Sequence, residues 1–177
     1  KNKIGEVVFN KITKVVVEEG VTHIGNLSLS NLGYYNSNDV EIQFDLPSTL
    51  LSIGKDAFAN SYGLRSLEIP ASVNEIGSSI HRNCINLSSI TVAEGNTAYK
   101  AIDNCLLTAD GQRLILGCKN SIIPDNVVTI YNAAFRGHSG LKEITLPRTL
   151  DAIGLYAFAG IADDAIVTCL AYELGLI

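Results

Sequence analysis

Methionine is absent from this 177-residue chain, which begins at Lys1 and shows no charged segment followed by an apolar leader. We therefore expect that any targeting segment has been removed and that the chain is a trimmed part of a longer protein. Long apolar runs are absent too, because stretches such as 114–118 fall far short of the roughly 20 residues that cross a bilayer. Basic excess is also lacking, with 13 Lys and Arg against 18 Asp and Glu and a net charge of −5. We expect no membrane insertion of this chain and no nucleic-acid partner.

Cysteine is scarce, and the cysteines form no CxxC pair and no cysteine–histidine cluster at the spacing of zinc ligands. They are interpreted as small, buried hydrophobic residues. The alternative is a disulfide between Cys105 and Cys118, which lie on the two arms of a predicted hairpin. The four cysteines are Cys84, Cys105, Cys118 and Cys169.

What the chain does contain is an internal repeat, in a composition that is 47% hydrophobic and typical of a folded domain. We call the residue directly before the proline position of each repeat its marker. In all seven repeats an apolar or aromatic residue follows seven positions after the marker, and in four of them proline follows the marker directly. The base period is 23 residues, as from Ile53 to Ile76 and from Ile130 to Ile153. The markers are Val17, Leu46, Ile69, Val92, Ile123, Leu146 and Cys169.

Two departures from the period predict insertions. The step from Ile24 to Ile53 is 29 residues, which places extra residues near 34–39. The fourth repeat is degenerate, and residues 106–116 read as two short strands around Asp110-Gly111, a strong hairpin signal. A second insertion is therefore expected near 100–118.

Within a repeat, alternation of apolar and polar residues predicts a short strand with one buried side, as in Leu67-Glu68-Ile69, and proline ends it. Gly77 and its equivalents are predicted to supply a tight turn. Pairs such as Ala57-Phe58 are predicted to fill the space between successive coils. Residues 1–177 are thus expected to form a single solenoid domain of about seven coils. The coils are mainly short β-strands and turns, in a right-handed curved superhelix with an inserted β-hairpin.

The columns L-x-x-I-x-I-P-x-x-V-x-x-I-G-x-x-A-F resemble the leucine-rich repeat variant of the BspA-like bacterial surface proteins over roughly residues 12–170. Departures are Leu29, His81 and Asn104 at the phenylalanine position and Ser121 at a strand position. The resemblance implies an exported, non-enzymatic protein of host-associated bacteria, in a family linked to adhesion to host matrix proteins and to other cells. It carries over no binding residues, since the shared columns are core positions.

No candidate catalytic or cofactor site survives comparison with the repeat. Residues 137–140 begin like the nucleophile motif G-x-S-x-G, but Leu141 replaces the final glycine and the segment aligns with an ordinary junction between coils. The three histidines lie in three repeats without ligand spacing. His81 replaces a core aromatic and is expected to be partly buried with one hydrogen bond, while His23 is expected to point to solvent. We expect no cofactor, no metal and no enzyme activity.

Two surfaces are candidates for partner binding. Asp45, Glu68 and Glu143 are predicted to share one column on the outward row of the main strands, where they would form a mildly acidic face for a basic patch. The alternative is a solvated face that serves solubility. The second candidate is the inserted loop with Tyr34 and Tyr35, because tyrosine supplies large contact area at low entropy cost.

The function predicted from the sequence is therefore a non-catalytic interaction module of a secreted or cell-surface bacterial protein. It would adhere to a host or bacterial surface protein. One alternative is a structural spacer that holds another domain away from the cell. The other is a carbohydrate-binding module, which would need an exposed aromatic platform or two converging carboxylates.

Overall fold

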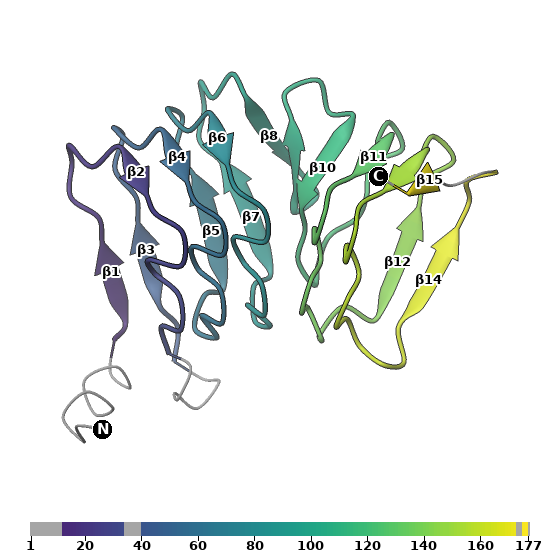
Figure 1. Cartoon of the computed structure of the whole chain (residues 1–177), viewed down its shortest axis with the longest axis horizontal. Helices are drawn as coiled ribbons and strands as arrows, with labels where there is room; N and C mark the ends of the chain where they lie inside the picture. The colour runs from purple at the N-terminus through teal and green to yellow at the C-terminus, as the bar shows by residue number, and fades with distance from the viewer. Residues whose placement is uncertain (1–11, 34–39, 173–174, 177) are drawn as a thin grey trace.

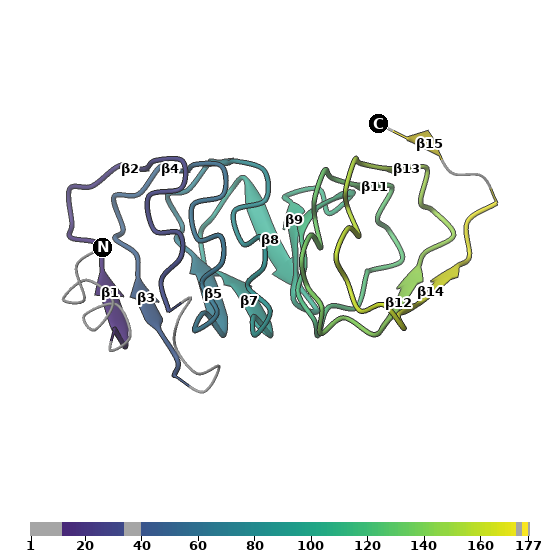
Figure 2. The same ribbon diagram turned by 60° about the horizontal axis from the view of Figure 1, so that its bottom comes forward.

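The computed structural model describes residues 12–33, 40–172 and 175–176, and in them the chain winds into a solenoid whose coils stack along the long axis (Figure 1). A second view shows the same order of coils, with the strands on two sides of the stack (Figure 2). All the regular elements in these ranges are short strands, so none of them is a helix that could cross a membrane. The predicted solenoid of short strands is confirmed. That all 177 residues form one domain stays a prediction.

One strand from each of six coils lies on a common side of the solenoid, which we call the long face. Neighbours pair in parallel as β1–β3, β5–β7 and β12–β14, giving three separate two-stranded sheets. The alternation read from the sequence is present, since Leu67 and Ile69 are buried while Ser66 and Glu68 are exposed. The strands are β1 Lys14–Val16, β3 Gln43–Asp45, β5 Ser66–Ile69, β7 Ser89–Val92, β12 Glu143–Leu146 and β14 Ile166–Cys169.

A second row of two-residue strands runs along another side of the solenoid. β2, β4 and β6 form a parallel three-stranded sheet, while β11, β13 and β15 continue a sheet that starts in the inserted segment. Each strand begins the return leg of its coil, and its second residue lies seven positions after the marker. These strands are β2 His23–Ile24, β4 Ser52–Ile53, β6 Glu75–Ile76, β11 Thr129–Ile130, β13 Ala152–Ile153 and β15 Gly175–Leu176.

The predicted hairpin is present and is part of a larger antiparallel meander of three strands, β8 (Tyr99–Ile102), β9 (Cys105–Thr108) and β10 (Arg113–Leu116). Gly111 has φ 78°, as the turn between β9 and β10 requires. The sequence did not reveal β8. The meander joins the second row of strands because β10 pairs in parallel with β11.

The meander also divides the interior into two cores. Because successive side chains of a strand point to opposite sides, Leu106 of β9 packs into the first core while its neighbours Cys105 and Leu107 pack into the second. β10 also reaches both cores, but through an irregularity: its register with β9 shifts between Leu114 and Leu116, so Leu116 packs into the first core and Leu114 into the second. The apolar run in β9 is thus explained by burial on both faces.

Large rings fill the space between coils, as predicted. Phe58 and Phe135 are fully buried, one in each core. Phe58 meets Phe44 edge to face at 5.2 Å between ring centroids, and Phe135 stacks on Phe158 at the same distance. His81 occupies the equivalent position in the coil of β5 and is fully buried as well.

The repeated glycine has a different role from the predicted one. Gly77 does not have a positive φ, and a Cβ built on it would lie 2.5 Å from the backbone nitrogen of Lys55 in the preceding coil. The left-handed residue of the turn comes two positions later, at Ser79 with φ 58°. Gly54 and Gly154 show the same close backbone approach. The prediction that this glycine supplies the tight turn is wrong, because it is the contact between coils that leaves no room for a side chain.

A ladder of asparagines ties three coils together beside these turns. Asn31, Asn60 and Asn83 all have φ near +60°, a conformation that asparagine tolerates. The Nδ2 of Asn60 donates to Asn31 Oδ1 at 2.9 Å, and the Nδ2 of Asn83 donates to Asn60 Oδ1 at 2.8 Å. Each amide therefore serves both the turn and the stacking of coils.

Candidate functional site

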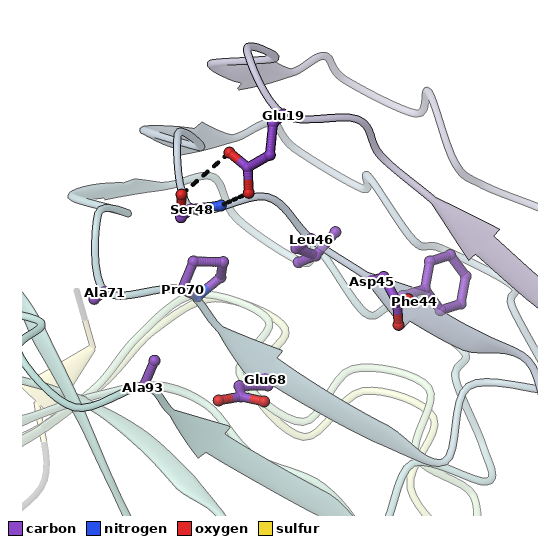
Figure 3. A pocket seen from close by; sticks show the side chains of 9 residues that line it. All are labelled: Glu19, Phe44, Asp45, Leu46, Ser48, Glu68, Pro70, Ala71 and Ala93. Carbon is purple, nitrogen blue, oxygen red and sulfur yellow. Dashed lines mark hydrogen bonds between the residues drawn. The ribbon is translucent and has the colours of Figure 1, made fainter.

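Side chains at the end of the long face surround an open hollow of about 470 Å³ (Figure 3). The hollow lies where the strands give way to the proline turns, beside the break between the sheet of β3 and the sheet of β5. Its floor is apolar and three carboxylates stand around it. We call it the acidic hollow, and it is lined by Glu19, Phe44, Asp45, Leu46, Ser48, Glu68, Pro70, Ala71 and Ala93.

Glu19 is held in place by the next coil. Its Oε1 accepts a hydrogen bond from the backbone N–H of Ser48 at 2.9 Å, and its Oε2 accepts one from the Ser48 hydroxyl at 3.1 Å (Figure 3). The backbone N–H of Ser48 lowers the pKa of the Glu19 carboxyl; desolvation opposes this, and the hydroxyls of Ser48 and Thr49 and the Thr49 N–H add to the lowering. Glu19 is therefore a fixed carboxylate at one side of the hollow.

Asp45 and Glu68 are exposed at corresponding positions of β3 and β5, as the sequence predicted. Asp45 Oδ2 lies 2.6 Å from Lys14 Nζ, and both side chains are about half exposed, at 52% and 50%. The pair is open to water, so it neutralises part of the charge without adding much stability. With Glu19, three carboxylates line the hollow, and no Lys or Arg is among the described residues that line it, so its surface is acidic.

Glu143 does not belong to this column, so that prediction is wrong. It is the first residue of β12 and pairs with Ile166, whereas Glu68 is the third residue of β5 and corresponds to Thr145. Glu143 still faces outward, but it lines a separate hollow of about 300 Å³ together with Asp125. That hollow is also lined by Ser121, Ile122, Ile123, Ile144, Thr145 and Pro147. Tyr34 and Tyr35, the other candidates, lie outside the described residues.

The cysteines fit the simpler interpretation except at one position. All four are free, so the alternative of a disulfide between Cys105 and Cys118 is wrong. Cys84, Cys105 and Cys118 are buried, and burial raises the pKa of the Cys84 and Cys105 thiols to about 12. Cys169 is exposed on β14.

The segment that resembles a nucleophile motif carries no such geometry. Ser139 is exposed while the neighbouring His138 is fully buried, with neither ring nitrogen hydrogen-bonded among the described residues. His81 is fully buried, rather than partly as predicted, and has the one hydrogen bond expected, between Nε2 and the Gly117 carbonyl at 2.7 Å. His23 is exposed, as expected. Over the described ranges, no three side chains of His, Cys, Asp or Glu come together as metal ligands would.

Sequence reasoning missed Glu19 as a member of the acidic hollow. It follows its marker, Val17, by two positions, the same offset at which Ser48 follows Leu46. That shared offset was the signal that could have placed Glu19 beside Ser48.

The sequence also gave no sign of two exposed tyrosines near the C-terminal end, each beneath an arginine. The guanidinium carbon of Arg136 lies 5.4 Å from the ring centroid of Tyr156, and that of Arg148 lies 5.9 Å from the ring centroid of Tyr172.

The family model of the BspA type leucine rich repeat region matches residues 28–108 and 116–168, in six copies. The two matched ranges together cover most of the described coils. No curated protein sequence matches the chain significantly.

Several solved structures share the fold. The chain is similar to a leucine rich cell surface protein from Faecalibacterium prausnitzii A2-165, with a TM-score of 0.72 and 26% identity over 93% of this chain and 43% of that one. It is also similar to the pneumococcal vaccine antigen PcpA, with a TM-score of 0.58 and 20% identity over 88% of this chain and 50% of that one. A leucine-rich repeat protein from Eubacterium ventriosum gives a TM-score of 0.58 and 19% identity, over 94% and 62%. This chain thus spans less than two thirds of each.

Proposed function

This chain belongs to the BspA-type leucine-rich repeat family, and from that premise we propose that it is an interaction module of a secreted or cell-surface bacterial protein that adheres to a partner protein through the acidic hollow. Repeats of this type are generally protein-binding and non-catalytic. The partner is a surface or matrix protein of a host, or of another cell, that presents a basic patch.

The single observation that carries the proposal is the geometry of the acidic hollow. Glu19, Asp45 and Glu68 come from three coils and stand around an apolar floor that includes Phe44 and Pro70 (Figure 3). Glu19 is already oriented by Ser48, so binding costs little of its side-chain entropy. A lysine or arginine of a partner could meet the carboxylates while its methylene stem covers the floor.

The proposal is tested by a binding titration of the chain against immobilised host matrix glycoproteins and a glycan array, at low and at physiological salt. We expect saturable binding to a protein that weakens as salt rises, because the charges at the hollow are exposed and screened. The double variant Asp45→Lys, Glu68→Lys is expected to abolish it. Both side chains are exposed, so the variant should remain folded, which a thermal melt would verify.

A matched control carries the same change of charge elsewhere on the long face. The double variant Asp125→Lys, Glu143→Lys alters the second hollow by the same four units and should bind like the natural chain. If both double variants lose binding equally, net charge rather than the acidic hollow is responsible. Absence of binding at tens of micromolar would favour the structural spacer, and binding confined to glycans would favour the carbohydrate-binding module.

A further inference from the structure

Two histidines meet in the interior at a place that the acidic hollow does not involve. The rings of His81 and His138 are fully buried, with their centroids 4.7 Å apart and their planes inclined by 43°. Within the described part of the chain, His81 Nε2 is the one ring nitrogen of the four with a hydrogen bond, and it must be the donor because its partner is the Gly117 carbonyl. Buried polar atoms without partners are rare and costly, so this arrangement calls for a physical explanation.

The pair marks the point where the two parts of the solenoid touch directly. His81 belongs to the coil of β5, whose neighbouring Ile80 and Cys84 are in the first core, and His138 belongs to the coil of β11, whose Phe135 and Leu141 are in the second. The segments 79–84 and 133–138 also meet through the backbone, since Asn83 N–H donates to the Arg136 carbonyl at 3.3 Å. We call this contact the seam. In three other coils the position of His81 is filled by an apolar ring, at Phe58, Phe135 and Phe158.

We propose that the His81–His138 pair makes the seam an acid-sensitive joint, which is closed while both rings are neutral and opens when they take up protons. An open seam is one in which both rings reach water while the two cores keep their own packing. The proposal concerns the stability of the module, and it does not depend on what the acidic hollow binds.

The surroundings of the pair favour the neutral rings. Burial lowers the pKa of His81 to about 4, against the opposing effect of the Gly117 and Ala134 backbone carbonyls. Burial also lowers the pKa of His138 well below its usual value, and the neighbouring His81 and Lys119 lower it further. In the described residues, no carboxylate is among the groups that act on either ring.

The other ionisable groups near the seam either interact with another side chain or carry no charge. On the side of the first core, Arg82 Nε lies 2.9 Å from Asp56 Oδ1, and the buried Cys84 thiol has a raised pKa that keeps it uncharged. On the other side, Arg136 lies over the exposed ring of Tyr156. A proton added to the closed seam would therefore meet positive charge from Lys119 and no carboxylate to balance it.

The direction of the pH effect follows from proton linkage. Both pKa values are lower in the closed state than in water, so the open state binds more protons and gains stability as the pH falls. The effect begins near the ordinary histidine pKa of 6.5 and ends near the closed-state value, which for His81 is about 4. Between pH 7.5 and 5.5 each exposed ring multiplies the opening equilibrium constant by about ten, and the two together by about a hundred.

Hydrogen exchange followed by mass spectrometry on the intact chain at pH 7.5 and 5.5 tests the joint. After correction for the intrinsic exchange rate, protection in 79–84, 116–118 and 133–138 is expected to fall between about tenfold and a hundredfold. Protection of the long-face strands β5 and β12 should fall far less. An equal fall in all peptides would mean that acid unfolds the whole chain, and unchanged protection at the seam would mean that no joint exists; either overturns the proposal.

Substitutions of the two histidines test whether the pH response of the seam comes from this pair or from other titrating groups. His81→Phe introduces the ring found at Phe58 and Phe135, and His138→Ile introduces the residue found at Ile161, so both replacements already occur at equivalent positions. The double variant should lose the pH response of the seam, and His81→Phe alone should reduce it to about tenfold. His23→Ala is the matched control, because that ring is exposed and bonded to Ser52 Oγ, and it should leave the response intact. A double variant with the natural response would refute the assignment, and the wild-type profile tests the joint even if a variant fails to fold.

Discussion

The same substitution at two equivalent glycines should have opposite effects on stability. Gly25 and Gly77 occupy one column of the repeat, and neither has a positive φ, so alanine is conformationally allowed at both. A Cβ at Gly77 would lie 2.5 Å from Lys55 N and 2.8 Å from the carbonyl carbon of Gly54, which are backbone atoms that cannot rotate away. A Cβ at Gly25 would meet nothing within 4 Å, because Gly25 belongs to the first described coil.

The expected magnitudes follow from these contacts. Overfilling a packed site costs about 1–3 kcal/mol, and a clash with backbone places Gly77→Ala toward the upper part of that range. Replacing glycine by alanine also removes freedom from the unfolded chain, which stabilises by about 0.4–1 kcal/mol where the site has room. We therefore expect Gly77→Ala to lower the free energy of unfolding by about 1–2 kcal/mol, and Gly25→Ala to raise it by up to about 1 kcal/mol.

Urea unfolding followed by circular dichroism measures both effects as shifts of the midpoint at constant slope. A thermal melt gives a second reading, since each kcal/mol corresponds to about 2–4 °C for a chain of this size. Gly154→Ala should behave like Gly77→Ala, because its Cβ would lie 2.4 Å from Asn132 N. If Gly25→Ala and Gly77→Ala shifted the midpoint equally and in the same direction, close backbone approach would not explain this column.

Three further predictions concern the interior and the turns. Phe135→Ala should lower the free energy of unfolding by about 3–5 kcal/mol in a urea titration, because the ring is fully buried between coils. Asn60→Gly keeps a residue suited to φ 58° and loses the two ladder hydrogen bonds, so a melt should show a smaller loss for it than for Asn60→Ala, which adds backbone strain of about 1 kcal/mol. Cys169 should react promptly with a thiol reagent at pH 8 in the native protein, with the other three cysteines following only after denaturation, and prompt reaction of more than one thiol would contradict their burial.

Much of the fold could be predicted because the core residues recur at the same positions of each repeat. The alternation around Leu67 and Ile69 predicted both a strand and its buried side, and the turn at Asp110-Gly111 predicted the hairpin. β8 was missed because its side chains are mostly half-buried and show no alternation. The role of Gly77 was wrongly predicted because the sequence does not distinguish a glycine that a turn requires from a glycine that a neighbouring backbone packs against.

The candidate site could be predicted only in part. Asp45 and Glu68 were placed correctly from strand alternation, whereas Glu143 was placed in the wrong column because its position was not counted from the marker residue Leu146. Glu19 joins them only through its hydrogen bonds to Ser48, which link residues that are 29 apart in the sequence. The binding role of Asp45, Glu68 and Glu143 stays a prediction.

The sequence by itself determined that the chain is a stack of similar coils, because a pattern repeated every 23 residues leaves an apolar side that only neighbouring coils can cover. Which residues that stacking actually covers was decided by the tertiary structure. Leu67 and Val167 hold the same place in their repeats, yet Leu67 is 2% exposed and Val167 is 42% exposed. His81 and His138 hold different places, yet their rings are in contact. The period determines which side chains each coil directs toward its neighbours. Whether those side chains are buried depends on which segment lies beside the coil, and the inserted meander changes that segment for the coils next to it.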